Sequence, residues 1–280
     1  MPLELCNAPA TFVQLMERVL NGLPWEVCLL YLDDIIVHAT TFKAELERLC
    51  SVFTRLREAG LKLSPKKCHL FKSRVVFLGH IVSEEGVSPD PEKIKAVCEW
   101  PTPTSVSALR SFLGLCSYYR RFVRGFANVA APLHRLTENN KVFVWTNKCD
   151  VAFHWLKQVL SQAPVLAYPT SEGAFILDTD ASNTGIGAVL SQKQGEEEKI
   201  ITSFSCSLTK SEPQYHVTRK ELLALITAVR HFHHYVYGRH IKVRTDHGAL
   251  RWLMNFKNPE GQTARWIKIL GIYDLEVEHC

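Results

Sequence analysis

The chain has 280 residues, 46% of them hydrophobic, and its 33 Lys and Arg against 28 Asp and Glu give a net charge of +5 at pH 7. This apolar content is enough for a packed core, and the length predicts one large domain or two modest ones. No apolar run reaches the roughly 20 residues that a membrane-spanning helix needs, which argues against a protein built on such helices.

Positive charge is concentrated in the first half of the chain. Residues 43–80 hold nine Lys and Arg against three Glu, and residues 106–136 hold five Arg and no acid, whereas the part after residue 174 is nearly balanced. A net charge of +5 alone does not indicate nucleic acid. Two basic stretches of this kind would nevertheless attract a phosphate backbone, because binding releases its counterions.

The nine cysteines are scattered and form no Cys-x-x-Cys pair, so the spacing of a zinc ribbon is absent. Their number is odd and no signal peptide opens the chain. Both observations favour reduced thiols in an intracellular protein.

The first predicted element in chain order is a helix from about Asn7 to a break at Gly22-Leu23-Pro24. Asn7 can cap this helix, and Pro9 is tolerated in the first turn because its missing N–H has no helical partner there. Apolar residues at core spacing follow, from Phe12 to Val19.

A β-hairpin with two acids at its tip is predicted next. The apolar stretches 27–31 and 35–37 are strands by composition, and Asp33-Asp34 lies between them. Turns favour Asp, so an ordinary polar turn is one interpretation. The other is a metal site, because paired carboxylates repel each other unless a cation neutralises them, and Mg²⁺ binds one or two carboxylates plus substrate phosphates.

Helices and a second hairpin follow in the middle of the chain. Residues 42–59 predict an amphipathic helix that ends at Gly60, and residues 75–82 predict a hairpin. Two further helices are predicted at 105–124 and 149–162.

From residue 174 the pattern changes to that of a mixed sheet. Three strands followed by alternating helix and strand are typical of an α/β fold. The predicted elements are strands at 175–180, 185–190 and 200–205, a helix at 218–234, a strand at 241–245, two short helices and a final strand at 273–278.

Four ordered motifs occupy the first half of the chain: residues 1–12, the Tyr31-Leu32-Asp33-Asp34 turn, the lysine-bearing residues 60–68, and Phe77-Leu78-Gly79-His80. In this order they resemble the reverse transcriptase of Ty3/gypsy-type retrotransposons.

Further motifs extend this resemblance to essentially the whole chain. Residues 109–122 resemble the stretch that joins polymerase to ribonuclease H, and Thr179–Ser182, Glu221 and Thr245–His247 resemble the ribonuclease H core. The resemblance implies an α/β (α+β) fold: part of a polymerase palm with its primer-grip hairpin (1–88), thumb and connection helices (89–172), and a C-terminally truncated ribonuclease H-like mixed sheet with helices (173–280).

For the polymerase, the resemblance implies that Asp33 and Asp34 are catalytic and hold Mg²⁺ (or Mn²⁺), and that Lys67 or Lys66 assists proton transfer to pyrophosphate. The alternative for the two lysines is a solvated charge pair. The residues implied to bind nucleotide or primer are Asn7, Ala8, Pro9, Tyr31, Lys67, Phe77, Leu78, Gly79 and His80.

Two departures from the family lead us to expect an inactive polymerase. Leu3-Glu4-Leu5 stands where the family has Phe-Gly-Leu, which places an acid near the nucleotide. The family's first catalytic aspartate lies upstream of these residues, and two-metal phosphoryl transfer needs that ligand to bridge the ions.

For the ribonuclease H core, the resemblance implies that Asp180, Glu221 and Asp246 are the catalytic metal ligands. Two ions would activate a water and stabilise the leaving 3′ oxygen of the RNA. On spacing alone, three unrelated surface acids would be the better interpretation. Asp178 lies on the same strand face as Asp180 and is expected to be a solvated acid. The family's fourth carboxylate lies beyond Cys280, so we expect weakened cleavage.

Arginines and aromatic residues predict a nucleic-acid track, because guanidinium and aromatic faces suit a sugar-phosphate backbone and nearby bases. One predicted helix holds six such residues: Tyr118, Tyr119, Arg120, Arg121, Phe122 and Arg124. We expect Leu113, Tyr119 and Phe122 to face inward and the three arginines to face outward; the predicted track is Arg110, Arg120, Arg121 and Arg124. His231, His233 and His234 form a cluster that is either a metal site or a set of cations favoured by a helix C-terminus.

The resulting hypothesis is a retroelement reverse transcriptase and ribonuclease H of the cytoplasm or nucleus. Its partners would be an RNA–DNA hybrid, template-primer and, in the full-length parent, dNTP, with no membrane partner. The alternative is a decayed or repurposed fragment that binds nucleic acid or another partner without catalysis.

Overall fold

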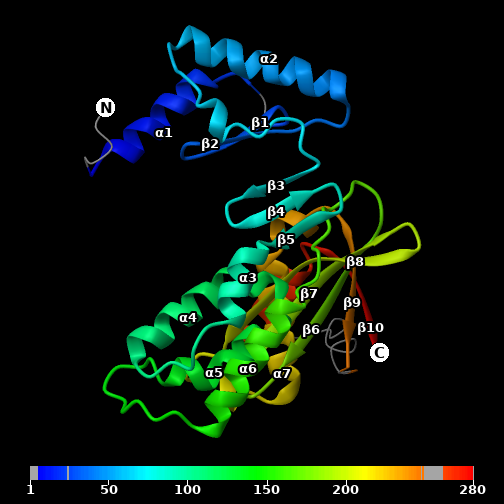
Figure 1. Ribbon diagram of the computed structural model, residues 1–280. Coiled ribbons are helices and arrows are strands. Elements are labelled where there is room, and N and C mark those ends of the chain that lie inside the picture. Colours follow the sequence, from blue (N-terminus) through cyan, green and yellow to red (C-terminus); the bar gives the residue numbers. More distant parts are fainter. Residues whose placement is uncertain (1–5, 24, 247, 249–260, 280) are drawn as a thin grey trace. The chain divides into compact units, whose positions relative to one another are not determined.

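The computed structural model describes residues 6–23, 25–246, 248 and 261–279 (Figure 1). The chain forms two compact units, and the boundary between them in the sequence lies between Lys72 and Ser73. Helices and sheets are present in both units, which confirms the predicted mixed α/β class. The finer predicted divisions after residues 88 and 172 stay predictions. None of the described helices is long and apolar enough to cross a membrane.

The first unit packs two helices against one hairpin. Helix α1 (Ala8–Val19) and helix α2 (Phe42–Glu58) enclose a small core with the antiparallel strands β1 (Cys28–Tyr31) and β2 (Asp34–Val37). A short 3₁₀ turn, η1 (Pro65–Lys67), follows. The buried members of this core are Met16, Leu20, Cys28, Val52 and Leu56.

Helix α2 has capping residues at its ends, whereas helix α1 lacks the expected cap at its start. Thr41 caps α2, since its hydroxyl accepts a hydrogen bond from the Ala44 amide at 3.2 Å, and Gly60 follows the helix end at φ +71° as predicted. Asn7 stands at the start of α1, but its side chain forms no capping bond. The predicted Asn7 cap is therefore wrong. Pro24, in the predicted break, lies outside the described residues.

The second unit begins with a three-stranded antiparallel sheet made of β3 (Arg74–Phe77), β4 (His80–Ser83) and β5 (Gly86–Pro89). The first two strands are the predicted second hairpin. A backbone bridge between Val87 and Leu166 ties the third strand to the lead into the large sheet. Gly86 is required there, because a Cβ would come within 2.1 Å of the Leu166 carbonyl oxygen.

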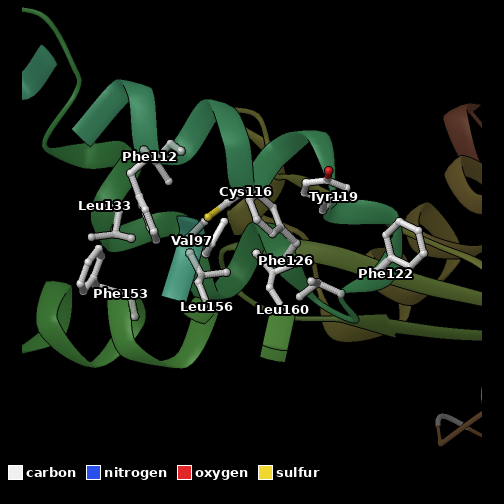
Figure 2. Packing of buried hydrophobic residues seen from close by; sticks show 14 of the residues in the cluster. Val97, Phe112, Cys116, Tyr119, Phe122, Phe126, Leu133, Phe153, Leu156 and Leu160 are labelled. Carbon is white, nitrogen blue, oxygen red and sulfur yellow. The ribbon is translucent and has the colours of Figure 1, made fainter. Parts of the chain in front are cut away.

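A helical layer follows this small sheet. It consists of α3 (Pro91–Cys98), α4 (Val106–Tyr118), the 3₁₀ turn η2 (Arg120–Phe122), α5 (Phe126–Arg135) and α6 (Asn147–Ser161). Figure 2 shows side chains from these helices meeting in one core. Its fully buried members include Phe112, Phe153 and Leu156.

The single helix predicted at 105–124 is wrong, because the chain leaves helical geometry at Tyr119. The 3₁₀ turn follows, then Val123 is extended and Gly125 takes φ +67°. The break lets both Tyr119 and Phe122 be buried, as predicted, although a single straight helix does not carry them.

The large sheet has the strand order β10-β9-β6-β7-β8. Strands β6, β7 and β8 are antiparallel neighbours, whereas β9 runs parallel to both β6 and β10. The strands are β6 (Phe175–Ala181), β7 (Gly185–Gln194), β8 (Glu197–Ser207), β9 (His240–Thr245) and β10 (Asp274–His279). The predicted strands are all present, and the second and third are longer than expected.

Helix α7 (Val217–His231) packs on this sheet, and its apolar side chains form a second core with the strands. The turn η3 (Glu212–Gln214) precedes it, and the short helix α8 (His233–Val236) follows, so the helix predicted at 218–234 is broken at Phe232. Of the two short helices predicted before the last strand, the structure describes α10 (Gly261–Leu270); residues 249–260 lie outside the described part.

Helices cover both faces of the sheet at β8. Neighbouring residues of a strand point to opposite faces. The Phe204 ring stacks on His231 at the end of α7, whereas the Ser205 hydroxyl accepts a hydrogen bond from the Ala127 amide of α5. The helical layer and the large sheet therefore share an interface within the second unit.

Candidate active site

Three acids come from three different elements at one edge of the large sheet. Asp180 is the penultimate residue of β6, Asp246 directly follows β9, and Glu221 lies in the first half of α7. Because β6 and β9 are adjacent and parallel, their carboxyl ends meet at the same edge. Asp180 and Asp246 are exposed, whereas Glu221 is only 3% exposed.

These acids interact electrostatically. Burial, and then repulsion from Asp246 and Asp180, raises the pKa of Glu221 to about 7, although a backbone hydrogen bond from Ala181 acts in the opposite direction. The Oε2 atom of Glu221 is buried and has no hydrogen-bond partner among the described residues. A buried, unpaired carboxylate oxygen beside two further acids is an environment that a cation would stabilise.

The chemistry of this donor set fits a hard divalent ion, since all three side chains offer carboxylate oxygens. Within the described part of the chain, however, no three His, Cys, Asp or Glu side chains lie close enough together to hold one ion. The three carboxylates therefore share one edge and one electrostatic environment without forming a closed ligand cage.

The loop that follows Asp180 is held by residues that the sequence did not single out. Asn128 of α5 accepts hydrogen bonds through Oδ1 from the hydroxyls of Ser182 and Thr184, at 2.9 and 3.1 Å. The buried Lys220 donates through Nζ to Asn183 Oδ1 at 2.6 Å. No local motif predicts this role of Asn128, because Asn128 lies more than 50 residues before Ser182 and Thr184 in the sequence.

The expectation that Asp178 is a solvated acid is wrong. Its carboxylate accepts two hydrogen bonds from Arg244, at 2.6 and 2.7 Å, and its side chain is 21% exposed. Arg244 also pairs with Glu198. Asp178 thus belongs to an ion-pair network with Arg244 and Glu198, and it is not one of the three acids proposed at the edge of the sheet.

The predicted polymerase acids lie at the tip of the β1–β2 hairpin, in the first unit. Tyr31 pairs with Asp34 across the strands, Leu32 takes φ +53°, and Asp33 completes the two-residue turn. Tyr31, Asp33 and Asp34 are all exposed. An exposed hairpin tip leaves both carboxylates available to an ion without holding them in a preformed cage.

The other residues predicted to bind nucleotide lie elsewhere in the same unit. Asn7, Ala8 and Pro9 form the start of α1, where Ala8 is buried and its two neighbours are exposed. Lys66 and Lys67 lie in η1, exposed, and neither forms a salt bridge among the described residues. Glu4 lies outside the described part.

The predicted primer-grip residues form the tip of the β3–β4 hairpin. Leu78 and Gly79 take φ +49° and +66°, the geometry of a tight two-residue hairpin turn. The hydroxyls of Tyr118 and Tyr119 donate to the carbonyl oxygens of Leu78 and Gly79, the second at 2.7 Å. The end of α4 thus fixes this turn in position.

The arginines of the predicted track lie on separate elements. Arg110, on α4, donates to the Thr137 carbonyl oxygen at 3.0 Å. Arg120 and Arg121 lie in η2, and Arg124 follows it. Arg120 and Arg124 point outward as predicted, while Arg121 is half-buried against the Phe122 ring. The placement of all six aromatic and basic residues on one helix is therefore wrong.

Comparison with known proteins gives the class of this chain. Residues 1–82 match the family model of the reverse transcriptase (RNA-dependent DNA polymerase), and residues 145–243 match that of the RNase H-like domain found in reverse transcriptase. The chain therefore carries a reverse-transcriptase region and an RNase H-like region of the kind found in reverse transcriptase, as its motifs predicted.

Its relatives are the Pol polyproteins of retrotransposons. It is 40% identical over 280 residues to the retrovirus-related Pol polyprotein from transposon 297 of Drosophila melanogaster, and 34% identical over 290 residues to that from transposon gypsy. It is 31% identical over 284 residues to the transposon Tf2-3 polyprotein of Schizosaccharomyces pombe. These matches cover 99–100% of this chain but only 26%, 28% and 21% of the respective relatives.

Solved structures share the fold. The foamy viral protease-reverse transcriptase dRH in complex with double-stranded DNA matches with a TM-score of 0.81 at 24% identity, over 97% of this chain and 49% of the other. The foamy viral protease-reverse transcriptase in complex with an RNA/DNA hybrid matches with a TM-score of 0.79 at 23% identity, over 100% and 39%.

Proposed function

We propose that the acids Asp180, Glu221 and Asp246 hydrolyse the RNA strand of an RNA–DNA hybrid with Mg²⁺ or Mn²⁺, within a protein that copies RNA into DNA. The observation that carries this proposal is the convergence of Asp180, Glu221 and Asp246 from three separate elements at one edge of the large sheet. The raised pKa of the buried Glu221 follows from burial and from the charges of the two aspartates. One foamy viral relative in fold is described in complex with an RNA/DNA hybrid, which supports the substrate class.

In this proposal the buried acid and the two exposed acids have different tasks. A bound divalent ion would lower the pKa of a water and stabilise charge on the phosphate. Without a cation, the Glu221 carboxyl group is half protonated near pH 7. Because only the ionised carboxylate binds a metal ion, binding of the ion releases the remaining proton. The exposed Asp180 and Asp246 supply oxygens on the solvent side, where a strand of nucleic acid can approach.

The test is cleavage of a labelled RNA–DNA hybrid by the purified chain with Mg²⁺ or Mn²⁺. Asp180→Asn should lower the rate by about 100-fold or more, because it removes a proposed metal ligand. Glu196→Gln is the matched control, since Glu196 is an exposed acid in the turn between β7 and β8. Equal cleavage by the wild type and Asp180→Asn would refute the assignment.

A second candidate function is hybrid binding without cleavage. It is favoured by the observation that no three described acids lie close enough to hold one ion. The same assay separates the two candidates: an intact RNA strand, together with retention of the hybrid in a mobility-shift measurement that weakens steeply with salt, would support binding alone.

We propose, for the first unit, that Asp33 and Asp34 form the metal-binding turn of the polymerase, which acts on template-primer and dNTP in the whole protein. Their exposure at the two-residue turn of the β1–β2 hairpin supports this. Added Mn²⁺ should broaden the NMR signals of residues 31–34 first, and Asp34→Asn should abolish that preference. Glu47→Gln, on an exposed acid of α2, should leave it unchanged. Equal broadening in the wild type and Asp34→Asn would contradict the proposal.

A further inference from the structure

A cavity of about 270 Å³ lies where the helical layer meets the edge strand β8 of the large sheet. One wall is the end of α4 with η2, a second is β8, and a third is the end of α7 with α8. Its lining residues are Ser117, Tyr118, Arg120, Arg121, Thr202, Ser203, Phe204, His231, Phe232, His234 and Tyr235.

The lining gathers basic groups and contains no acid. Two arginines come from η2 and two histidines from the end of α7 and from α8. Among the described residues, neither Arg120 nor Arg121 forms a salt bridge. Like charges held together in this way repel one another unless an anion lies between them.

The groups are close enough to affect one another. The pKa of His231 is lowered first by burial, then by the positive charge of Arg120, and then by His234. Next to the cavity, the pKa of His80 is lowered first by burial and also by the positive charge of Arg121, against a hydrogen bond with the Leu78 backbone that raises it. The basic groups therefore form one electrostatic cluster around the cavity.

Arg121 also has an unmet hydrogen-bond donor. Its Nε atom is buried from solvent and has no partner in the described structure. Leaving a buried donor without an acceptor costs free energy, and the cost is greater for a charged group. An anion in the cavity would supply the acceptor.

The walls hold these groups in place. The His231 ring stacks on Phe204, with 4.1 Å between ring centroids, and the Arg121 guanidinium lies 5.7 Å from the centroid of the Phe122 ring. The hydroxyl-bearing Ser117, Thr202 and Ser203 complete the lining. Guanidinium forks can bind two phosphate oxygens at once, and the hydroxyl groups can donate to the remaining oxygens.

We propose that this cavity binds a phosphate group through Arg120, Arg121, His231 and His234. The site itself follows from the cavity and its charges. The identity of the physiological phosphate rests on the proposed function: it belongs to the backbone of a nucleic acid strand. The junction of the helical layer and the large sheet would then contact that strand, apart from the three acids. Free inorganic phosphate is the other source of the same chemistry.

The test is an NMR titration of the histidine ring signals with inorganic phosphate, at constant ionic strength against chloride. The His231 and His234 signals should shift and saturate. Arg121→Gln should weaken binding by about tenfold or more, because it removes a charge and a fork of donors. Arg135→Gln, at an exposed arginine of α5 that does not line the cavity, should change it less than twofold. Absence of a saturable shift, or equal effects of the two variants, would overturn the site.

Two additional measurements keep the result interpretable. Arg120→Gln repeats the test in case Arg121→Gln fails to fold, which thermal unfolding would reveal. The dinucleotide TpT should compete with inorganic phosphate for the cavity. If phosphate binds saturably but TpT does not compete, the phosphate site stands and its assignment to a nucleic acid backbone is overturned. Asp180→Asn should leave the phosphate titration unchanged, so the failure of the nuclease proposal is distinguishable from the failure of this one.

Discussion

At the scale of single residues, Glu221 makes stability depend on pH. Its pKa is raised to about 7 in the folded chain, above the ordinary value of 4.5. Between these two values the unfolded chain is ionised while the folded chain remains protonated. The unfolded chain thus binds fewer protons, and stability falls as pH rises through this window.

The expected size of this effect is up to about 3 kcal/mol between pH 4.5 and pH 7, from the difference in pKa. Glu221→Gln should remove it, so the gain in stability of the variant over the wild type should grow across the window. Urea unfolding at pH 5 and pH 8 without divalent ions measures this. A gain that is the same at both pH values would contradict the prediction.

The ion-pair network around Arg244 is a second residue-scale feature. Arg244→Met should lower the free energy of unfolding by about 1 kcal/mol, because Asp178 loses a two-pronged partner while the partial exposure of the network limits the loss. Lys199→Ala, which breaks an exposed 3.7 Å pair with Glu197, should change it by only a few tenths. A larger loss in the control, measured by urea unfolding, would overturn this reasoning.

At the scale of elements, the end of α4 determines the position of the β3–β4 turn. Tyr119 is 1% exposed and donates to the Gly79 carbonyl oxygen, so Tyr119→Phe should cost about 1 kcal/mol by leaving that oxygen without this donor. Tyr118→Phe should cost less, because Tyr118 is 49% exposed and water can replace its hydroxyl. Amide exchange of the hairpin should quicken more in Tyr119→Phe; equal rates in the two variants would argue against the prediction.

The sequence predicted a helix or strand wherever it contains a local pattern, such as an apolar stripe or a terminating glycine. Gly60 and the apolar stripe before it predicted α2 to within one residue. The break after α4 was missed because no Pro lies between 105 and 124 and the cause is burial of Tyr119 and Phe122. Helix α5 was missed although its apolar face is buried, since its internal Pro132 is a helix-breaking signal.

The acids of the candidate site were chosen by resemblance, since spacing alone favoured unrelated surface acids. Their shared edge depends on the parallel pairing of β6 with β9, in which Asp178 pairs with Arg244, 66 residues later in the chain. The ion pair of Asp178 with Arg244 was not predicted for the same reason, because the two residues are far apart in the sequence. Contacts of this range arise from tertiary packing, which a local pattern does not encode.

At the scale of the second unit, Asn128 couples the helical layer to the loop after Asp180. Asn128→Ala removes the acceptor for Ser182 and Thr184, and it should weaken Mn²⁺ binding at the sheet edge by about threefold to tenfold while costing about 1 kcal/mol of stability. Asn128→Asp keeps an acceptor oxygen and should restore most of the affinity. Mn²⁺ titration followed by water-proton relaxation measures this.

The matched control for this prediction is Asn139→Ala, at an exposed position after α5. It should leave the Mn²⁺ affinity unchanged. If Asn128→Ala loses stability but binds Mn²⁺ as the wild type does, the helical layer does not position the loop.

The strand order of the large sheet also has a consequence for synthesis on the ribosome. Strands β6, β7 and β8 are consecutive and can pair soon after they emerge, whereas β9 inserts beside β6 only after α7 has been made. Asp246 follows β9, so the third acid reaches the edge last. A nascent chain that has folded its first three strands therefore already buries hydrophobic surface but does not yet have the complete acidic edge, and any metal-dependent cutting must wait until translation has passed that point.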